Sequence, residues 1–379
     1  MDEINGLIYG LELQARALSP QYAETNEVRF FIATNSLKPT NQIHLVEYSE
    51  EKSQINSTIF EHSFGEVWKL NANPHDLYEI ATCFNEQTSN GIKSKAALLK
   101  YGENTDTIGK VKTELSWQQE EILETEIYGE KVKTVEFHPT QKQSLACVID
   151  NKVILYDRAE SKTRQAAEIA STSSSSKHLN HPFTGGKWSH HHQGQQFVAL
   201  HDTFIKAYDT RDNNHCAWSI EDSHGQLVRD IDCNLNKQCH FVTGGDDGFL
   251  KLWDCRMPKE PVFARNDHAH WVWCVRFNTF HDQLILSSSS DCKVLLTCAG
   301  SVSSEAAENV NPNAITSLEN TTQRKYLDDG LLHTFEQHED SVYCVEWSNV
   351  DPWIFASLSY DGRLLISKVP KQYKYQIIL

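Results

Sequence analysis

Histidine, a hydroxyl residue and aspartate recur in one order in the second half of the chain, followed in the first copy by tryptophan, and these side chains could do chemistry together. In the first copy they are His224, Thr243, Asp247 and Trp253. An imidazole between a hydroxyl and a carboxylate is the arrangement of a catalytic triad. The same groups, joined by an indole N–H, can also form a hydrogen-bonded chain that satisfies buried polar atoms.

The repetition of this pattern favours the structural role. Two later copies keep the spacing of histidine, hydroxyl and aspartate, and they contain His268, Ser287, Asp291, His338, Ser357 and Asp361. A catalytic triad is needed once, whereas a repeated unit carries its structural bonds in each copy. We therefore predict structural tetrads and no catalytic residue.

A second candidate for chemistry is the histidine run His190, His191 and His192, with His201 not far along. Imidazoles are good ligands for zinc and copper. Adjacent residues of a strand or turn point in different directions, however, and no cysteine or carboxylate sits at ligand spacing. We predict a polar turn and no metal site.

The glycines Gly244, Gly245 and Gly248 form the third candidate, a phosphate-binding loop. Such a loop leads into a helix whose N-terminus faces the phosphate, and no helical pattern follows here. These glycines predict a turn between strands, and no cofactor is expected.

The elements that must position these residues have the pattern of strands. Apolar side chains alternate at matching places, as Val272 and Val275 do in one copy and Val342 and Val345 in another. Short runs of β-formers are separated by Gly or Asp turns, and no window shows a sustained helical stripe. The period and the Trp-Asp ending resemble the WD40 repeat, in which each unit supplies four strands to a propeller blade.

Weaker copies of the unit extend through the first half of the chain. Residues 133–157 and 185–209 keep the strand rhythm, with Tyr156 and Tyr208 in the place of Trp253. Fainter copies cover 65–101, which carries a long insertion before 96–101, and 7–48, which begins with the unbroken segment LIYGLELQARALSP. The prediction is an all-β, seven-bladed propeller that occupies 1–379 as one domain.

Seven units of about 40–45 residues leave part of the chain over, so insertions are expected. Polar or serine-rich stretches at 102–127, 159–180 and 299–329 predict disordered loops. Because few residues precede the first strand, we predict that 375–379 supplies the outermost strand of the last blade and closes the ring.

Composition limits the partners and the compartment. The chain has 35 basic and 51 acidic residues and a formal net charge of -16, which argues against general binding to nucleic acid or to an acidic membrane. Ten cysteines occur without a Cys-x-x-Cys pair, as expected for small core residues in a reducing compartment. No signal peptide or membrane-spanning run is present, so we expect a soluble, cytoplasmic protein.

Candidate binding residues flank the first buried valine of each strong copy. These positions are expected at the propeller's top opening, and with their counterparts in weaker blades they are Trp68, Lys133, Leu227, Arg229, Trp271, Trp273, Ser341 and Tyr343. Trp, Tyr and Arg are enriched in binding hot spots. The alternative is that the aromatic side chains pack between blades.

Longer phrases resemble one family in particular. They are residues 223–230, HWVW at 270–273, HDQL at 281–284, 338–366, IYGLELQARALSP near the start and the terminal KYQIIL. Across its whole length the chain is similar to the WD40 family of EARP and GARP complex-interacting proteins.

The resemblance implies a seven-bladed scaffold without enzymatic activity that binds two multisubunit tethering complexes. It also implies roles in endosomal recycling, retrograde transport and dense-core vesicle cargo sorting, at recycling endosomes and the trans-Golgi network. The protein is then expected to be monomeric and to reach membranes only through its partners. Contacts made by the loops at 102–127 and 299–329, where the chain differs most, do not transfer.

A different function class is indicated by Trp253, Asp254 and Arg256. This Trp-Asp-x-Arg ending resembles the motif of substrate receptors in cullin-RING ubiquitin ligases. The structural alternative is that Arg256 forms a salt bridge at the lower face, since WD40 proteins of many functions end a blade in this way.

Overall fold

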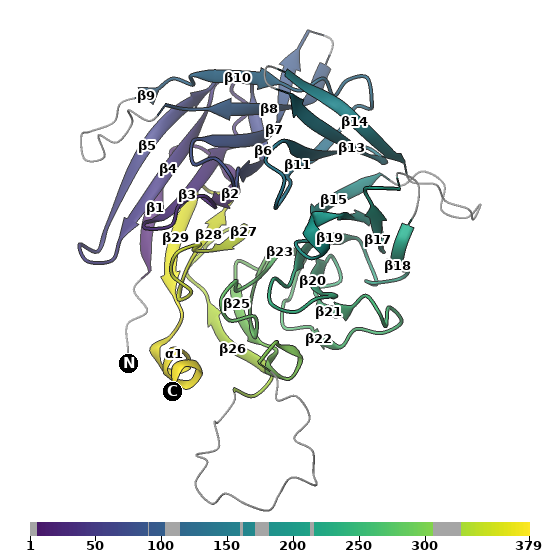
Figure 1. Cartoon of the computed structure of the whole chain (residues 1–379). Coiled ribbons are helices and arrows are strands. Elements are labelled where there is room, and N and C mark those ends of the chain that lie inside the picture. The colour runs from purple at the N-terminus through teal and green to yellow at the C-terminus, as the bar shows by residue number, and fades with distance from the viewer. Residues whose placement is uncertain are drawn as a thin grey trace, which may run out of the picture.

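The computed structural model describes residues 6–89, 91–102, 114–159, 162–170, 182–212, 216–305 and 327–379. Their strands form seven sheets arranged in a ring around one axis (Figure 1). The predicted all-β, seven-bladed WD40 propeller is confirmed.

Each blade is described from its innermost strand outward. Blade 1 contains β2 (Ala15–Pro20), β3 (Val28–Thr34), β4 (Asn41–Ser49), β5 (Gln54–His62) and the short parallel strand β9 (Glu114–Leu115). Blade 2 contains β6 (Glu66–Ala72), β7 (Glu79–Thr88), β8 (Gly91–Lys100) and β10 (Gln119–Ile122). Blade 3 contains β11 (Val132–Phe137), β12 (Ser144–Ile149), β13 (Lys152–Ala159) and β14 (Lys162–Ala170).

The remaining four blades follow in the same order. Blade 4 contains β15 (Phe183–Trp188), β16 (Gln196–His201), β17 (Phe204–Asp209) and β18 (Cys216–Ile220), with the 3-10 turn η2 (His192–Gly194). Blade 5 contains β19 (Val228–Cys233), β20 (His240–Gly245), β21 (Leu250–Asp254) and β22 (Phe263–Arg265). Blade 6 contains β23 (Val272–Phe277), β24 (Leu284–Ser289), β25 (Val294–Cys298) and β26 (Gly330–Phe335), with the turn η3 (Gly300–Val302). Blade 7 contains β27 (Val342–Trp347), β28 (Ile354–Ser359), β29 (Arg363–Lys368) and β1 (Leu7–Gly10).

Burial on both faces explains the composition of the middle strands. Every residue of β24 and of β28 is buried, because each blade packs against a neighbour on both sides. Seven apolar clusters lie between successive blades, and the cluster between blades 7 and 1 closes the ring. The ring is therefore held by one continuous series of blade-to-blade contacts.

The closing strand differs from the prediction. β1, from the N-terminus, pairs antiparallel with β29 from Leu7↔Ile366 to Gly10↔Arg363, and Leu11 N–H donates to the Gly362 carbonyl at 2.8 Å. The segment that looked like one unbroken strand is thus divided between blade 7 and blade 1. The division was missed because both parts are apolar and follow each other directly.

The C-terminal residues form a helix instead of the predicted strand 375–379. Helix α1 spans Lys371–Ile378 and follows Pro370, a residue suited to a helix start (Figure 1). Its Ile377 side chain is buried in the cluster between blades 6 and 7. The helix covers the end of that cluster, while the edge of β29 is already occupied by β1.

Two of the predicted loop insertions contain strands. Residues 102–127 include β9 and β10, and 159–180 include β14, so the described parts of these polar stretches supply outer strands. Residues 103–113, 160–161 and 171–180 lie outside the described part. Outer strands expose one edge to water and do not need an apolar pattern. Within 299–329, η3 is described, and residues 306–326 lie outside the described part.

The insertion predicted before 96–101 is a hairpin extension. β7 and β8 pair from Glu79↔Lys100 to Thr88↔Gly91, which makes them longer than their counterparts in other blades. Within the described residues, no helix combines the length and the apolar character needed to cross a membrane.

Candidate partner-binding rim and central cavity

The innermost strand of each blade contains one extra residue near its start. The pairing register with the second strand skips a residue at Arg16, Trp68, Lys133, Thr184, Arg229, Trp273 and Tyr343. A β-bulge of this kind leaves one residue unpaired in the ladder and re-aims its side chain. We call these seven residues the rim ring.

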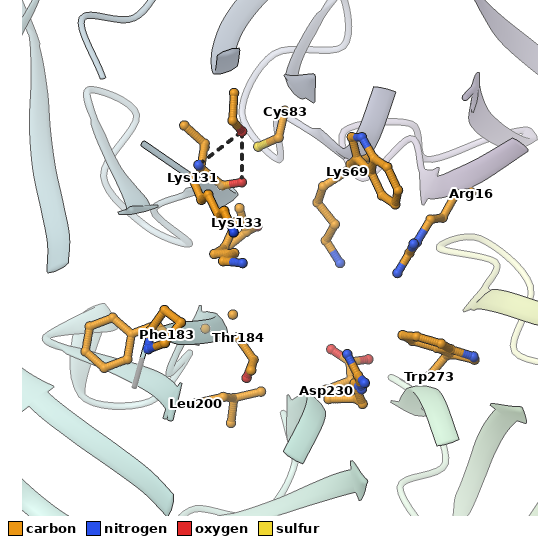
Figure 2. A pocket seen from close by; sticks show the side chains of 18 of the residues that line it. Arg16, Lys69, Cys83, Lys131, Lys133, Phe183, Thr184, Leu200, Asp230 and Trp273 are labelled. Atoms are coloured by element: carbon orange, nitrogen blue, oxygen red, sulfur yellow. Dashed lines mark hydrogen bonds between the residues drawn. The ribbon is translucent and has the colours of Figure 1, made fainter. Parts of the chain in front are cut away.

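All seven residues of the rim ring line one central cavity of about 850 Å³. Figure 2 shows several of its lining side chains, among them Arg16, Lys133, Thr184 and Trp273, around a common open space. This volume is in the range of about 300–1,000 Å³ that is typical of ligand sites. The fold thus collects one side chain from every blade at the same opening.

Arg16 lies at the centre of an aromatic cluster on this rim. Its guanidinium carbon lies 4.6 Å from the ring centroid of Trp68, 5.0 Å from that of Trp273 and 4.3 Å from that of Tyr343. These are cation–π distances, and three ring faces therefore stabilise one charge. The rings come from blades 2, 6 and 7, so the cluster exists only in the closed ring.

A second arginine extends the cluster to Trp271. The Arg229 guanidinium carbon lies 4.6 Å from the Trp273 ring centroid and 5.5 Å from that of Trp271. Arg229 also donates to both carboxylate oxygens of Asp246, at 2.6 and 2.7 Å. The Trp273 indole N–H donates to Ser290 Oγ at 2.6 Å, which fixes the ring between the two arginines.

The rim cations differ in whether a carboxylate neutralises them. Asp246 neutralises Arg229, whereas among the described residues no ion pair or hydrogen bond involves the side chains of Arg16, Lys131 or Lys133. Burial lowers the pKa of Arg16 and also that of Lys133, on which the charge of Lys131 acts in the same direction. The upper part of the cavity therefore carries cationic groups without counterions.

Below the rim, buried charges compensate one another. Arg276 binds Asp230 and donates to Glu346 at 2.7 Å, while Lys187 lies 2.9 Å from Asp232. These ion pairs join the innermost strands of neighbouring blades, 4 to 5, 5 to 6 and 6 to 7. Buried ion pairs of this kind hold neighbouring elements in register, and removal of one partner leaves a costly charge.

The predicted rim residues are distributed over two places. Trp68, Lys133, Leu227, Arg229, Trp273 and Tyr343 line the cavity. Trp271 stands outside the lining, 40% exposed, with its ring 5.8 Å from that of Trp273, and Ser341 is half-buried at the start of β27. Trp273 lines the cavity and also packs against the rings of Trp271 and Tyr343, so partner binding at this position stays a prediction.

Two members of the rim ring, Arg16 and Thr184, were not predicted from the sequence. Blades 1 and 4 lack the histidine from which the position is counted in the strong copies, and unlike Lys133 of blade 3 these two residues were not matched by the strand pattern. The segment Ala15–Leu18 does carry the signal, since it matches Val272–Val275 in having small or apolar residues around one different side chain. Recognition of that pattern required the break between β1 and β2.

The first tetrad forms a continuous hydrogen-bonded chain. The Trp253 indole N–H donates to Thr243 Oγ1 at 3.0 Å, Thr243 Oγ1 lies 2.7 Å from His224 Nε2, and His224 Nδ1 lies 2.9 Å from Asp247 Oδ1. Burial alone would raise the pKa of Asp247, but the hydrogen bonds from His224 and from backbone N–H groups lower it to about 2. Burial lowers the pKa of His224. Neutral His224 can therefore donate from Nδ1 to the Asp247 carboxylate and accept at Nε2 from the Thr243 hydroxyl.

A close approach at Gly245 is part of this arrangement. A Cβ at this position would lie 2.6 Å from His224 Nδ1, so only glycine leaves room for the imidazole. Gly244 and Gly245 end β20, and Gly248 has a φ of 78° in the following turn. The glycines thus lie in a strand and a turn.

The other two tetrads are variations. In blade 6, His268 lies 2.9 Å from both Asp291 Oδ2 and Ser287 Oγ, and a threonine, Thr297, stands in the place of the tryptophan. In blade 7, His338 lies 2.7 Å from Ser357 Oγ. Its second nitrogen lies 2.9 Å from Ser359 Oγ, which in turn donates to Asp361 at 2.5 Å. Ser359 therefore stands between His338 and Asp361, which were expected to bond directly.

The histidine run lies in and around η2 and is not brought to a common point. His191 Nε2–H donates to the Asn234 carbonyl at 2.7 Å, His190 is exposed, and His201 is buried beside the Phe183 ring. In the described part of the chain, no three His, Cys, Asp or Glu side chains are grouped as metal ligands would be.

The Trp-Asp-x-Arg ending forms a local salt bridge. Arg256 donates from Nε at 2.9 Å and from Nη2 at 2.6 Å to the two oxygens of Asp254. The Arg256 side chain is 65% exposed, so it stays accessible at the lower face.

Known proteins resemble the chain over its full length. A family model described as EIPR1 beta-propeller matches residues 3–297. The human protein named EARP and GARP complex-interacting protein 1 is 39% identical over 398 aligned residues, which cover 100% of both chains. The chain belongs to the EARP and GARP complex-interacting protein family.

Other relatives agree with this assignment. The EARP-interacting protein homolog of Gekko japonicus is 38% identical over 100% of both chains, and the EARP-interacting protein 1 of Caenorhabditis elegans is 31% identical over 98% of both. A WD domain, G-beta repeat model matches residues 330–366, from β26 through most of blade 7. In this member of the EARP and GARP complex-interacting protein family, the resemblance inferred from the sequence is confirmed.

Proposed function

We propose that the protein is a non-catalytic WD40 scaffold that binds the EARP and GARP vesicle-tethering complexes. The observation that carries the proposal is the full-length relationship to proteins whose names state an interaction with these complexes. Through the complexes, the protein supports endosomal recycling, retrograde transport to the trans-Golgi network and dense-core vesicle cargo sorting.

The rim ring, together with Trp271, is the proposed contact surface. Trp68 and Trp271 are 37% and 40% exposed, although large aromatic side chains are usually buried. Trp, Tyr and Arg dominate binding hot spots because they combine a large apolar area with a polar group. The same residues are already held in place by Arg16 and Arg229, so little side-chain order has to be gained on binding.

The protein acts in the cytoplasm as a monomer and reaches the trans-Golgi network and recycling endosomes through its partners. Its formal net charge of -16 supports indirect membrane association, because the cytoplasmic leaflet is negatively charged.

The test is a pull-down of tethering subunits by the full chain from cell lysate. We expect the double variant W271A/R229A to lose the subunits, because it removes two neighbouring hot-spot side chains at the rim. The matched control is F280A, a 47% exposed aromatic residue beyond the opposite end of β23, which should retain them. Equal melting temperatures of the variants check the fold.

If W271A/R229A retained the subunits, the assignment of the rim ring and Trp271 as the contact surface would be wrong. Recovery of a ubiquitin-ligase adaptor in place of tethering subunits, sensitive to R256A, would support the receptor function instead.

A further inference from the structure

We infer that the central cavity binds a short acidic peptide segment of a protein partner, with the Arg16 guanidinium as its anchor. The identification of that partner as a tethering subunit rests on the proposed function. The names of the full-length relatives state no chemistry for a bound segment.

The charge of the cavity is opposite to that of the chain. Six lysine and arginine residues line it against four aspartate and glutamate residues, in a chain whose formal net charge is -16. The carboxylate of Asp230 is engaged by Arg276, and Lys187 by Asp232, so these groups form part of the compensated layer below. Arg229 is likewise paired with Asp246. Among the described residues, the unpaired charges of the lining are then the cations Arg16, Lys69, Lys131 and Lys133 against the acids Glu130, Glu136 and Asp202, which is a small excess of positive charge.

Three of these cations are available to a ligand. Arg229 already binds Asp246, but the side chains of Arg16, Lys131 and Lys133 form no ion pair with another described residue. Burial lowers the pKa of both Arg16 and Lys133, and for Lys133 the attraction of Asp150 offsets only part of this effect. An incoming carboxylate would supply the missing counterion where its attraction is least screened.

The surroundings of Arg16 favour a carboxylate on a peptide. Trp68, Trp273 and Tyr343 surround the Arg16 guanidinium, and no described residue accepts a hydrogen bond from its N–H groups. A planar arginine fork binds a carboxylate through two parallel hydrogen bonds. The same rings offer apolar contact to the residues beside that carboxylate. The cavity therefore fits alternating acidic and apolar groups better than a free inorganic ion.

The overall charge disfavours long polyanions. A nucleic acid or an anionic bilayer would extend past the cavity onto the rest of a strongly acidic protein, which would repel it. A short peptide segment, in contrast, can place its carboxylates within a cavity of about 850 Å³.

The first experiment measures fluorescence anisotropy with the purified full chain. The probe is a fluorescein-labelled hexapeptide of aspartate and glutamate around one leucine, and the control peptide contains asparagine and glutamine instead. We expect the acidic peptide alone to bind, and R16Q and K131E/K133E each to weaken it by about tenfold or more, as loss of a charge-assisted hydrogen bond does. K142E/K259E, which changes two exposed lysines outside the cavity by the same charge, should bind like the parent.

The second experiment treats the complex of full chain and purified tethering complex with a carbodiimide, which joins a lysine amine to a contacting carboxylate without a spacer. We expect Lys131 or Lys133 to be linked to aspartate or glutamate of a tethering subunit. Equal binding of the acidic and amide peptides, or capture of phosphatidylserine vesicles in place of peptide, would overturn the inference.

The two proposals can fail separately. If the tethering complex binds but K131E/K133E and R16Q leave that binding unchanged, the acidic-segment inference is wrong and the proposed function stands. If the acidic peptide binds the cavity but no tethering subunit is recovered, the proposed function is wrong and the cavity assignment stands.

Discussion

The guanidinium carbon of Arg16 lies 4.3 Å from the ring centroid of Tyr343, although the two residues are almost at opposite ends of the sequence. Arg16 belongs to the innermost strand of blade 1 and Tyr343 to that of blade 7, so this contact crosses the seam at which the ring closes. The surface proposed to bind partners therefore depends on the same closure that stabilises the fold.

Removal of β1 should lower stability and disturb the seam. Deletion of residues 1–10 removes the four residue pairs between β1 and β29. It also removes the packing of Leu7 and Tyr9 against the cluster between blades 7 and 1. We expect a loss of about 2–4 kcal/mol in the free energy of unfolding, measured with urea. Truncation after Ile377, which removes only exposed side chains, is the control. If the deletion mutant had the same urea unfolding midpoint as the parent, pairing of β1 with β29 would not stabilise the propeller.

Thr243 should contribute more stability than its equivalent in blade 6. T243V preserves shape but leaves the Trp253 N–H and the His224 nitrogen without their shared partner. Buried groups left unsatisfied cost about 1–3 kcal/mol each, so we expect T243V to destabilise by about 2–4 kcal/mol. S287A, where no indole donates, should cost less. Equal losses for the two variants would argue against a chain of bonds that includes the tryptophan.

Stability should fall as the pH decreases from about 6.5 towards 4. Burial lowers the pKa of His62 and that of His338, each to about 4, so the folded protein keeps both neutral. The unfolded chain binds protons at these residues below its histidine pKa of about 6.5, and acid therefore favours unfolding. Between pH 7 and pH 5 we expect a loss of about 1–2 kcal/mol for each histidine, measured by urea unfolding.

A variant that cannot titrate isolates the contribution of one histidine. H338Q should be less stable than the parent at pH 7, because its bonds to Ser357 and Ser359 are altered, but its stability should depend less on pH. Asp247 does not interfere in this interval, since its pKa of about 2 and the unfolded value both lie below it. Parallel pH profiles for H338Q and the parent would contradict the assignment.

Release of Arg229 should strengthen binding of the acidic peptide. In D246N the guanidinium loses its carboxylate and becomes a further free cation beside Trp273. We expect the affinity for the acidic hexapeptide to rise by about two- to fivefold in the anisotropy measurement, most clearly at low ionic strength. D267N, which removes a carboxylate from an arginine pair elsewhere in blade 5, is the matched control. An unchanged affinity in D246N would place the bound carboxylate away from Arg229.

The repeat pattern made the architecture predictable at the level of blades. The spacing of His224, Thr243 and Asp247 is set within one blade, where strand lengths and turns fix it, so it is visible in the sequence. The position of the rim in the strong copies could be counted from the histidine in the same way. In blade 7 even this local pattern changed, because Ser359 is close enough to take the second bond of His338.

The sequence by itself determined the fold class, the number of blades and most of the residues at the rim, because each depends on alternation and spacing within a single unit. Only the tertiary structure decided that β1 closes the ring, that 371–378 is helical, and that Arg16 lies among aromatic rings from three other blades. These features arise from contacts between distant ends of the chain. The N-terminal strand and the C-terminal segment could both pair with the free edge of β29, and no pattern within one repeat shows which of them does.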